Sequence, residues 1–196
     1  SHRHEDHFNP AVFALADRKA DIQFLLGNDF HLTPHNLTKW QLSPEIAAKC
    51  RRCGKHGTFT PLPGVTVETF PSTDEGVAWM VTVNGQSIFH AGDLNWWHWA
   101  EEDLAWNRNM EANFKRYTEP LRGRRVDLAM LPLDSRLKMD GYLGPNYFLN
   151  LMEVRRFLPM HQWEDFAFTD EFLSAYPQFA PITVKIHRDG EFLGEL

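Results

Sequence analysis

Hydrophobic and polar positions alternate in three consecutive stretches of the chain. Residues 65–70, 77–83 and 86–92 each show the two-residue period of a half-buried strand. The Asn84-Gly85 pair between the last two stretches is a strong signal for a two-residue hairpin turn. Residues 126–134 form an apolar run with little alternation, which is typical of a strand buried on both faces.

Apolar residues recur at helical spacing between and after these strands. This spacing predicts helices over 99–121 and 145–158, the second of which opens with Pro145. The other predicted elements are a short helix running into a strand over 10–29, a helix turn after Ser43, a helix over 169–176, and a closing pair of strands at 182–187 and 191–196. Blocks of strands with helices between them indicate the α/β (α+β) class with mixed sheets.

Composition and charge narrow the function classes. A chain of 196 residues with 43% hydrophobic residues fits one globular domain, 1–196. A net charge of -6 gives no general attraction to nucleic acid or to an anionic membrane, and no apolar run is long enough to span one. Two cysteines cannot form a disulfide scaffold, so we expect a cytoplasmic protein.

The first seven residues, SHRHEDH, concentrate groups that bind metals. His2 and His4 point to the same side of an extended segment, and Asp6 and His7 follow where the chain turns. Imidazole nitrogens and a carboxylate oxygen are ligands that zinc takes at about 2.0–2.2 Å. A histidine-rich tail without a role is the alternative, but the embedded acid and the helix that follows favour a metal site.

The spacing His-x-His-x-Asp-His resembles the signature of the metallo-β-lactamase superfamily. Further along the chain, HAGDLN places Asp93 directly after a predicted strand, and LPMHQW places His161 where the last histidine ligand of that superfamily lies. The resemblance implies a four-layered αββα metallo-β-lactamase-like sandwich with mixed sheets. It also implies one or two divalent metal ions, with zinc expected first and manganese or iron as alternatives.

The resemblance assigns the metal ligands as follows: His2, His4, Asp6, His7, Asp93 and His161. One metal position would take His2, His4 and Asp93. The other would take Asp6, His7, Asp93 and His161, so Asp93 would bridge the two. The catalytic residues would be Asp93 and Asp6, since Asp6 would also accept a proton from the attacking water.

Two features depart from the superfamily pattern. A histidine ligand is usual between the opening motif and the bridging aspartate, but the corresponding stretch here, 69–81, has Ser72 to Glu75 and no histidine. Asp74 is either a substitute oxygen ligand or a turn cap, and its Ser-Thr-Asp context favours the turn. In addition, superfamily members have strands before the first motif, so we expect the natural protein to extend beyond Ser1.

Three residues are candidates for substrate contact. Trp97 and His98 come a few residues after Asp93, and Arg136 follows a buried strand, so all three should lie near the opening of the metal site. Aromatic side chains there would form a wall, and an arginine would bind a phosphate or carboxylate. The alternatives are that the tryptophan packs beneath the loop and that the arginine is simply solvated.

These observations predict a metal-dependent hydrolase whose metal-activated water attacks a small-molecule ester, lactone or phosphoester. One alternative is a nuclease or nucleotide phosphodiesterase, which the acidic balance disfavours. Another is a degenerate metal-binding protein without turnover. The expected partner is a small-molecule substrate and not a membrane, and the sequence leaves the oligomeric state open.

Overall fold

The computed structural model describes residues 1–194, and none of the helices in that range is long and apolar enough to cross a membrane. The elements, with 3₁₀ helices labelled η, are η1 (Pro10–Asp17), β1 (Phe24–Gly27), α1 (Pro34–Lys39), α2 (Pro44–Ala48), β2 (Cys50–Cys53), β3 (Gly57–Leu62), β4 (Val65–Pro71), β5 (Val77–Val83), β6 (Gln86–His90), α3 (Leu104–Thr118), η2 (Glu119–Leu121), β7 (Arg125–Pro132), η3 (Ser135–Tyr142), α4 (Leu143–Leu151), β8 (Glu153–Met160), α5 (Phe168–Ala175) and η4 (Pro177–Phe179).

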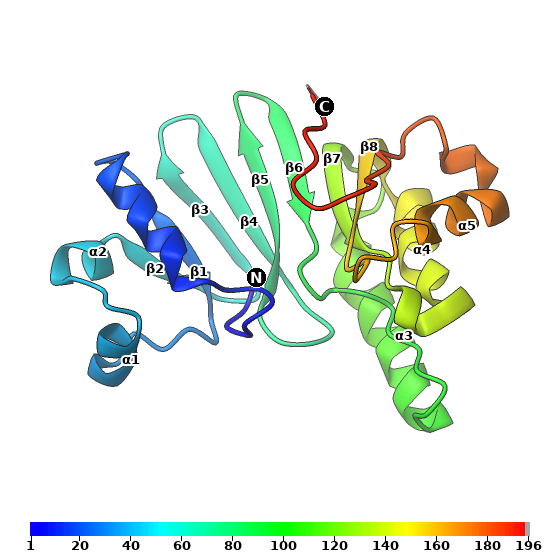
Figure 1. Cartoon of the computed structure of the whole chain (residues 1–196), viewed down its shortest axis with the longest axis horizontal. Helices are drawn as coiled ribbons and strands as arrows, with labels where there is room; N and C mark the ends of the chain where they lie inside the picture. The colour runs from blue at the N-terminus through cyan, green and yellow to red at the C-terminus, as the bar shows by residue number, and fades with distance from the viewer. Residues whose placement is uncertain (195–196) are drawn as a thin grey trace.

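A mixed six-stranded sheet dominates the molecule, with the strands in the order β3-β4-β5-β6-β7-β8 (Figure 1). Strands β3 to β6 are antiparallel, whereas β6, β7 and β8 run parallel. The hairpin predicted at Asn84-Gly85 joins β5 to β6. Both turn residues have the positive φ of a type I′ turn, 50° at Asn84 and 83° at Gly85, which only such residues adopt easily.

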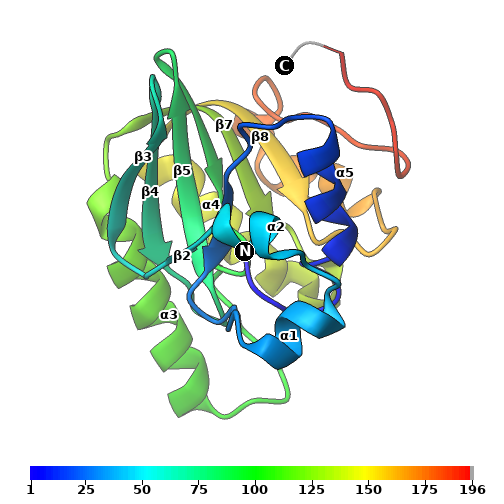
Figure 2. The same ribbon diagram turned by 90° about the vertical axis from the view of Figure 1, so that its left-hand side faces the viewer.

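The two faces of this sheet are covered differently (Figures 1 and 2). Helices α3, α4 and α5 pack on one face, while the parallel pair β1–β2 lies on the other side with η1, α1 and α2. The predicted α/β class with mixed sheets is confirmed, although the second sheet has only two strands within residues 1–194. The face toward this smaller layer keeps apolar side chains in solvent, including Val83 and Ile88.

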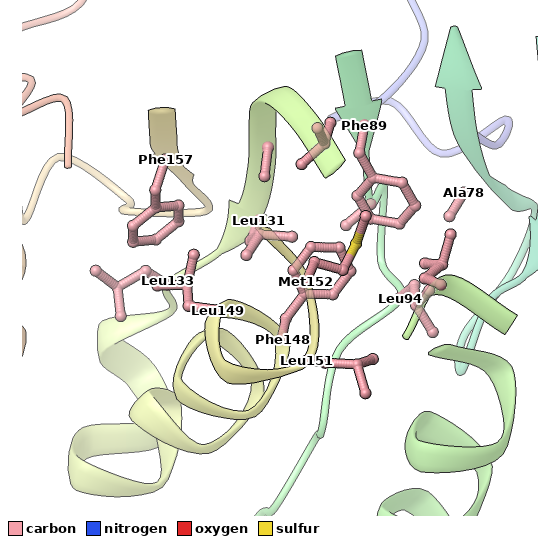
Figure 3. Packing of buried hydrophobic residues seen from close by; sticks show 14 of the residues in the cluster. Ala78, Phe89, Leu94, Leu131, Leu133, Phe148, Leu149, Leu151, Met152 and Phe157 are labelled. Carbon is pink, nitrogen blue, oxygen red and sulfur yellow. The ribbon is translucent and has the colours of Figure 1, made fainter. Parts of the chain in front are cut away.

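The main hydrophobic core lies between the large sheet and the three long helices (Figure 3). Phe148 of α4 stacks on Phe89 of β6 with ring centroids 4.8 Å apart, and Phe157 of β8 is also buried there. A separate, smaller cluster forms around Phe13 and Phe24. The second cluster packs the segment that follows the opening histidines and so anchors it.

Two sequence-based expectations are wrong or incomplete. A helix is predicted over 145–158, but in the structure the helix ends at Leu151 and β8 begins at Glu153. The second half of the predicted helix instead pairs as a strand along β7. Pairing within the parallel sheet here outweighs the helix propensity of the local sequence. The closing strands are not formed within 182–194, where Thr183 makes a single isolated bridge to Phe157. The last two residues of that prediction, 195 and 196, lie outside the described residues.

Strand direction explains where a site can form. β4 and β6 both run antiparallel to β5, and β7 and β8 run parallel to β6. The carboxyl ends of these four strands therefore meet at one edge of the sheet. The loops that leave this edge carry several of the chemically distinctive residues of the sequence.

Candidate metal centre

Four loops at the carboxyl edge of the sheet meet the amino-terminal segment of the chain. The loops following β4, β6, β7 and β8 contain Asp74, Asp93, Asp134 and His161, respectively. The amino-terminal segment can approach these loops closely because two glycines, Gly76 and Gly92, have no side chain where it passes. A Cβ added to Gly76 would lie 2.7 Å from the Cβ of His2, and one added to Gly92 would lie 2.5 Å from that of Ser1.

We predict that Gly76→Ala misplaces His2. Gly76 has φ +74°, so alanine is strained there by about 1–3 kcal/mol and must also displace the histidine. Gly123→Ala is a matched control, since Gly123 has φ +69° but nothing within 4 Å of its added Cβ. Urea unfolding should show a loss of stability in both variants, whereas metal analysis should show a loss of bound metal only in Gly76→Ala. Equal metal content in the two variants would contradict the prediction.

Three histidine side chains surround the carboxylate of Asp93. His161 Nε2 lies 2.9 Å and His7 Nε2 3.2 Å from its Oδ1, while His2 Nε2 lies 3.4 Å from its Oδ2. Asp6 Oδ2 is 3.6 Å from His7 Nε2 on the more exposed side of the cluster. Five residues from three separate segments of the chain thus aim ligand atoms at one small region.

Hydrogen-bond partners behind the histidines fix which ring nitrogen faces Asp93. Ser1 Oγ lies 3.2 Å from His2 Nδ1 and 2.9 Å from His7 Nδ1, which directs both Nε2 atoms inward. Asp134 Oδ2, 3.3 Å from His161 Nδ1, does the same for His161. Such outer partners orient the ligands of metal sites.

His4 is held from both sides of its ring. Its Nδ1 lies 2.9 Å from His2 Nε2, and its Nε2 lies 3.7 Å from Glu75 Oε2. His4 is nevertheless the most exposed of the four histidines, with 53% of its side chain in solvent. It therefore stands at the rim of the cluster.

The buried carboxylates of Asp93 and Asp134 both keep their negative charge in the cluster. Burial alone would raise the pKa of the Asp93 carboxyl, but the His161 and His7 imidazoles hold it well below its usual range. Burial likewise opposes ionisation of Asp134, yet Arg136 and His161 lower its pKa to about 2. Burial would also lower the pKa of His161, but Asp134 and Asp93 raise it to about 9. Both aspartates are ionised at neutral pH.

These residues fit a divalent cation. Although two ring nitrogens approach Asp93 Oδ1, their angles give no hydrogen bond, and this buried oxygen has none among residues 1–194. Ligand atoms lie within 4.8 Å of one another in two groups, one of His2, Asp6 and His7 and one of His7, Asp93 and His161. Imidazoles and carboxylates without thiolates suit zinc, manganese or iron.

A cavity of about 330 Å³ opens onto one side of the cluster. Tryptophans form most of its apolar wall, and its polar groups are mostly acids and imidazoles. It is lined by His4, Asp6, Thr73, Asp74, Asp93, Trp97, Trp99, Trp106, Met110, Arg136, His161 and Trp163.

Five of the six expected ligands fall in the two ligand groups, and the sixth, His4, stays at the rim. The grouping differs from the expected one, because Asp6 and His7 join His2, and Asp93 belongs to one group only.

The other expected site residues differ in where they lie. Asp74 lines the cavity, but its Oδ1 accepts a hydrogen bond from the Glu75 backbone at 2.9 Å, as expected for a turn cap, and it belongs to neither ligand group. Trp97 lines the cavity and donates from Nε1 to the Asp93 backbone oxygen at 3.0 Å. Arg136 lines it as well, whereas His98 is not among its lining residues.

Sequence analysis did not assign a role to three residues that contact the cluster. Asp134 is fully buried behind His161, Glu75 lies behind His4, and Trp163 follows His161 and donates from Nε1 to Asp134 at 3.3 Å. Asp134 ends the run PLD at a strand terminus, and this position was a usable signal. Nothing in the local sequence pairs Glu75 or Trp163 with its partner.

No family model matches the sequence, and neither does any curated protein. Among solved structures, the chain is similar to a protein from Parabacteroides distasonis named as a metal-dependent hydrolase, with TM-score 0.61 and 16% identity over 95% of this chain and 74% of that one. It is also similar to CmlA, a diiron β-hydroxylase from Streptomyces venezuelae, with TM-score 0.50 and 9% identity over 83% of this chain and 43% of that one. A third similar structure is the metallo-β-lactamase fold protein YhfI from Bacillus subtilis, with TM-score 0.44 and 10% identity over 77% and 70%. At these identities the similarity concerns the fold.

Proposed function

We propose that the chain has the metallo-β-lactamase fold that the sequence predicts, and that it is a metal-dependent hydrolase of a small-molecule ester, lactone or phosphoester. The observation that carries the proposal is the buried Asp93 carboxylate. It is ionised, has an oxygen without a hydrogen bond to any residue of 1–194, and faces the Nε2 atoms of three histidines.

The proposed chemistry divides between the ion and the chain. A divalent ion held by these residues would lower the pKa of a water toward neutrality and polarise a carbonyl or phosphoryl oxygen. Asp6, with 48% of its side chain exposed at the cavity, is placed to take a proton from the attacking water. The water oxygen bonds to the acyl carbon or phosphorus, the bond to the leaving oxygen breaks, and the proton passes to that oxygen.

Cavity size and charge favour a small molecule over nucleic acid. A volume of about 330 Å³ is at the lower end of the range of ~300–1,000 Å³ found for small-molecule sites. Asp6, Asp74 and Asp93 line it, and this acidity would repel a polyphosphate chain. We therefore propose a small-molecule partner, and we retain a cytoplasmic location in the proposal because both cysteines are free thiols.

The first test is metal content, measured by mass spectrometry on protein purified without chelator or nickel resin. We expect about one or two ions per chain, and removal by EDTA should lower the unfolding temperature. Readdition of Zn²⁺ or Mn²⁺ at about a hundred times its dissociation constant should restore about 2.7 kcal/mol. Ester, lactone and phosphoester screens should then show activity that depends on the ion. Protein without metal, unaffected by EDTA and inactive with every ion, would contradict the proposal.

A further inference from the structure

One permanently charged basic side chain, that of Arg136, lines the cavity beside the ligand cluster, and its neighbours hold it in a fixed position. Arg136 is the only arginine or lysine among the described residues that line this cavity. Its Nε and Nη2 donate to the Asp134 carboxylate at 2.9 and 2.6 Å. Two parallel bonds of this kind fix the plane of a guanidinium group as well as its place.

Two aromatic rings add to this restraint. The guanidinium carbon lies 4.3 Å from the centre of the Trp163 ring and 5.5 Å from that of Trp99. Both tryptophans line the same cavity. Cation–π contact with two rings further limits the motion of a side chain that is otherwise 46% exposed.

The third donor group of Arg136 remains available. Nη1 makes no hydrogen bond to any of residues 1–194, whereas Nε and Nη2 are both used. Arg136 is not the only partner of the buried Asp134 carboxylate, which also lies within hydrogen-bond distance of His161 Nδ1 and Trp163 Nε1. Charge compensation of Asp134 is therefore not a sufficient role for Arg136. A fixed guanidinium with a free edge, facing a cavity, is typical of anion recognition.

We propose that the substrate carries a single oxyanion, a carboxylate or a phosphate, bound by Arg136, and an apolar body that lies against Trp97, Trp99 and Trp163. This inference rests on the proposed function, because it names the substrate class of the same site. One anionic group is specified since the three carboxylates that line the cavity would oppose a second such group. The tryptophans provide the apolar surface at low entropic cost.

The test compares two esters of equal chain length, 4-nitrophenyl hexanoate and the mono-4-nitrophenyl ester of adipic acid. The measured quantity is the ratio of kcat/KM for the charged ester to kcat/KM for the neutral one. Arg136→Gln should lower this ratio about ten- to a hundredfold, since a charge-assisted hydrogen bond is lost. Arg136→Lys should retain part of it. Arg155→Gln, which removes an exposed charge from β8, should leave the ratio unchanged.

A ratio that stays unchanged in Arg136→Gln, with both rates lowered equally, would overturn the inference and leave Arg136 a structural role. A binding measurement separates this failure from failure of the proposed function. If the wild-type protein hydrolyses neither ester, calorimetric titration with phenylphosphonate still tests the anion site. Binding at least tenfold weaker in Arg136→Gln would support the site, and equal binding would reject it.

Discussion

Asp93→Asn is expected to remove most of the bound metal and to lower any hydrolytic rate by on the order of a thousandfold. Asparagine keeps the size of the side chain but has no charge, so the Nε2 atoms of His2, His7 and His161 lose the anion that they share. An ion at this site would lose a carboxylate ligand and part of its charge balance. Metal analysis and the hydrolysis screen measure the two effects separately.

Asp127→Asn is the matched control for this variant. Asp127 lies near the opposite end of the large sheet, on β7, and its carboxylate accepts a hydrogen bond from the Ser87 backbone at 2.9 Å. Its loss should lower stability by about 1 kcal/mol and leave metal content unchanged. If Asp93→Asn retained wild-type metal content and wild-type activity, Asp93 would not be a ligand and the proposed site would be misplaced.

Sequence pattern predicted the fold where local and tertiary signals agree. The Asn84-Gly85 hairpin follows from backbone sterics alone, and the strands on both sides of it alternate as they pair. Residues 145–158 show the opposite case. Their apolar spacing is typical of one long helix. In the structure the helix ends at Leu151, and the following residues form β8, which buries the Phe157 side chain in the core. Only packing against β7 makes that choice.

The predicted ligand set could be read from the sequence because its members lie in one short motif or directly after strands. His2 to His7 form the motif, and Asp93 and His161 each follow a strand. Asp134 and Glu75 differ, since each acts through a histidine far away in the chain. Asp134 is separated from His161 by the helices η3 and α4 and the strand β8, and no periodicity encodes that contact. The assignment of metal ligands itself stays a prediction until the ion is measured.

Asp134 connects the ligand cluster to the substrate side of the cavity. It is fully buried, and one carboxylate faces both His161 Nδ1 and the guanidinium of Arg136. It therefore orients a predicted ligand and a predicted substrate contact at once, without touching the substrate. A residue in this position should affect metal affinity more than a residue that matters only for stability.

Asp134→Asn is therefore expected to weaken metal binding by about 10- to 100-fold and to cost about 1–3 kcal/mol of stability. The amide presents donor hydrogens where the carboxylate accepts them, so the His161 ring loses the partner that fixes its Nε2 toward Asp93. Leu121→Ala, at a fully buried position in η2, should cost about 2–5 kcal/mol yet leave the metal dissociation constant unchanged. Competition with a chromophoric chelator and urea unfolding, applied to both variants, distinguish positioning from general destabilisation. Equal metal affinity in Asp134→Asn and the wild-type protein would show that Asp134 does not position His161.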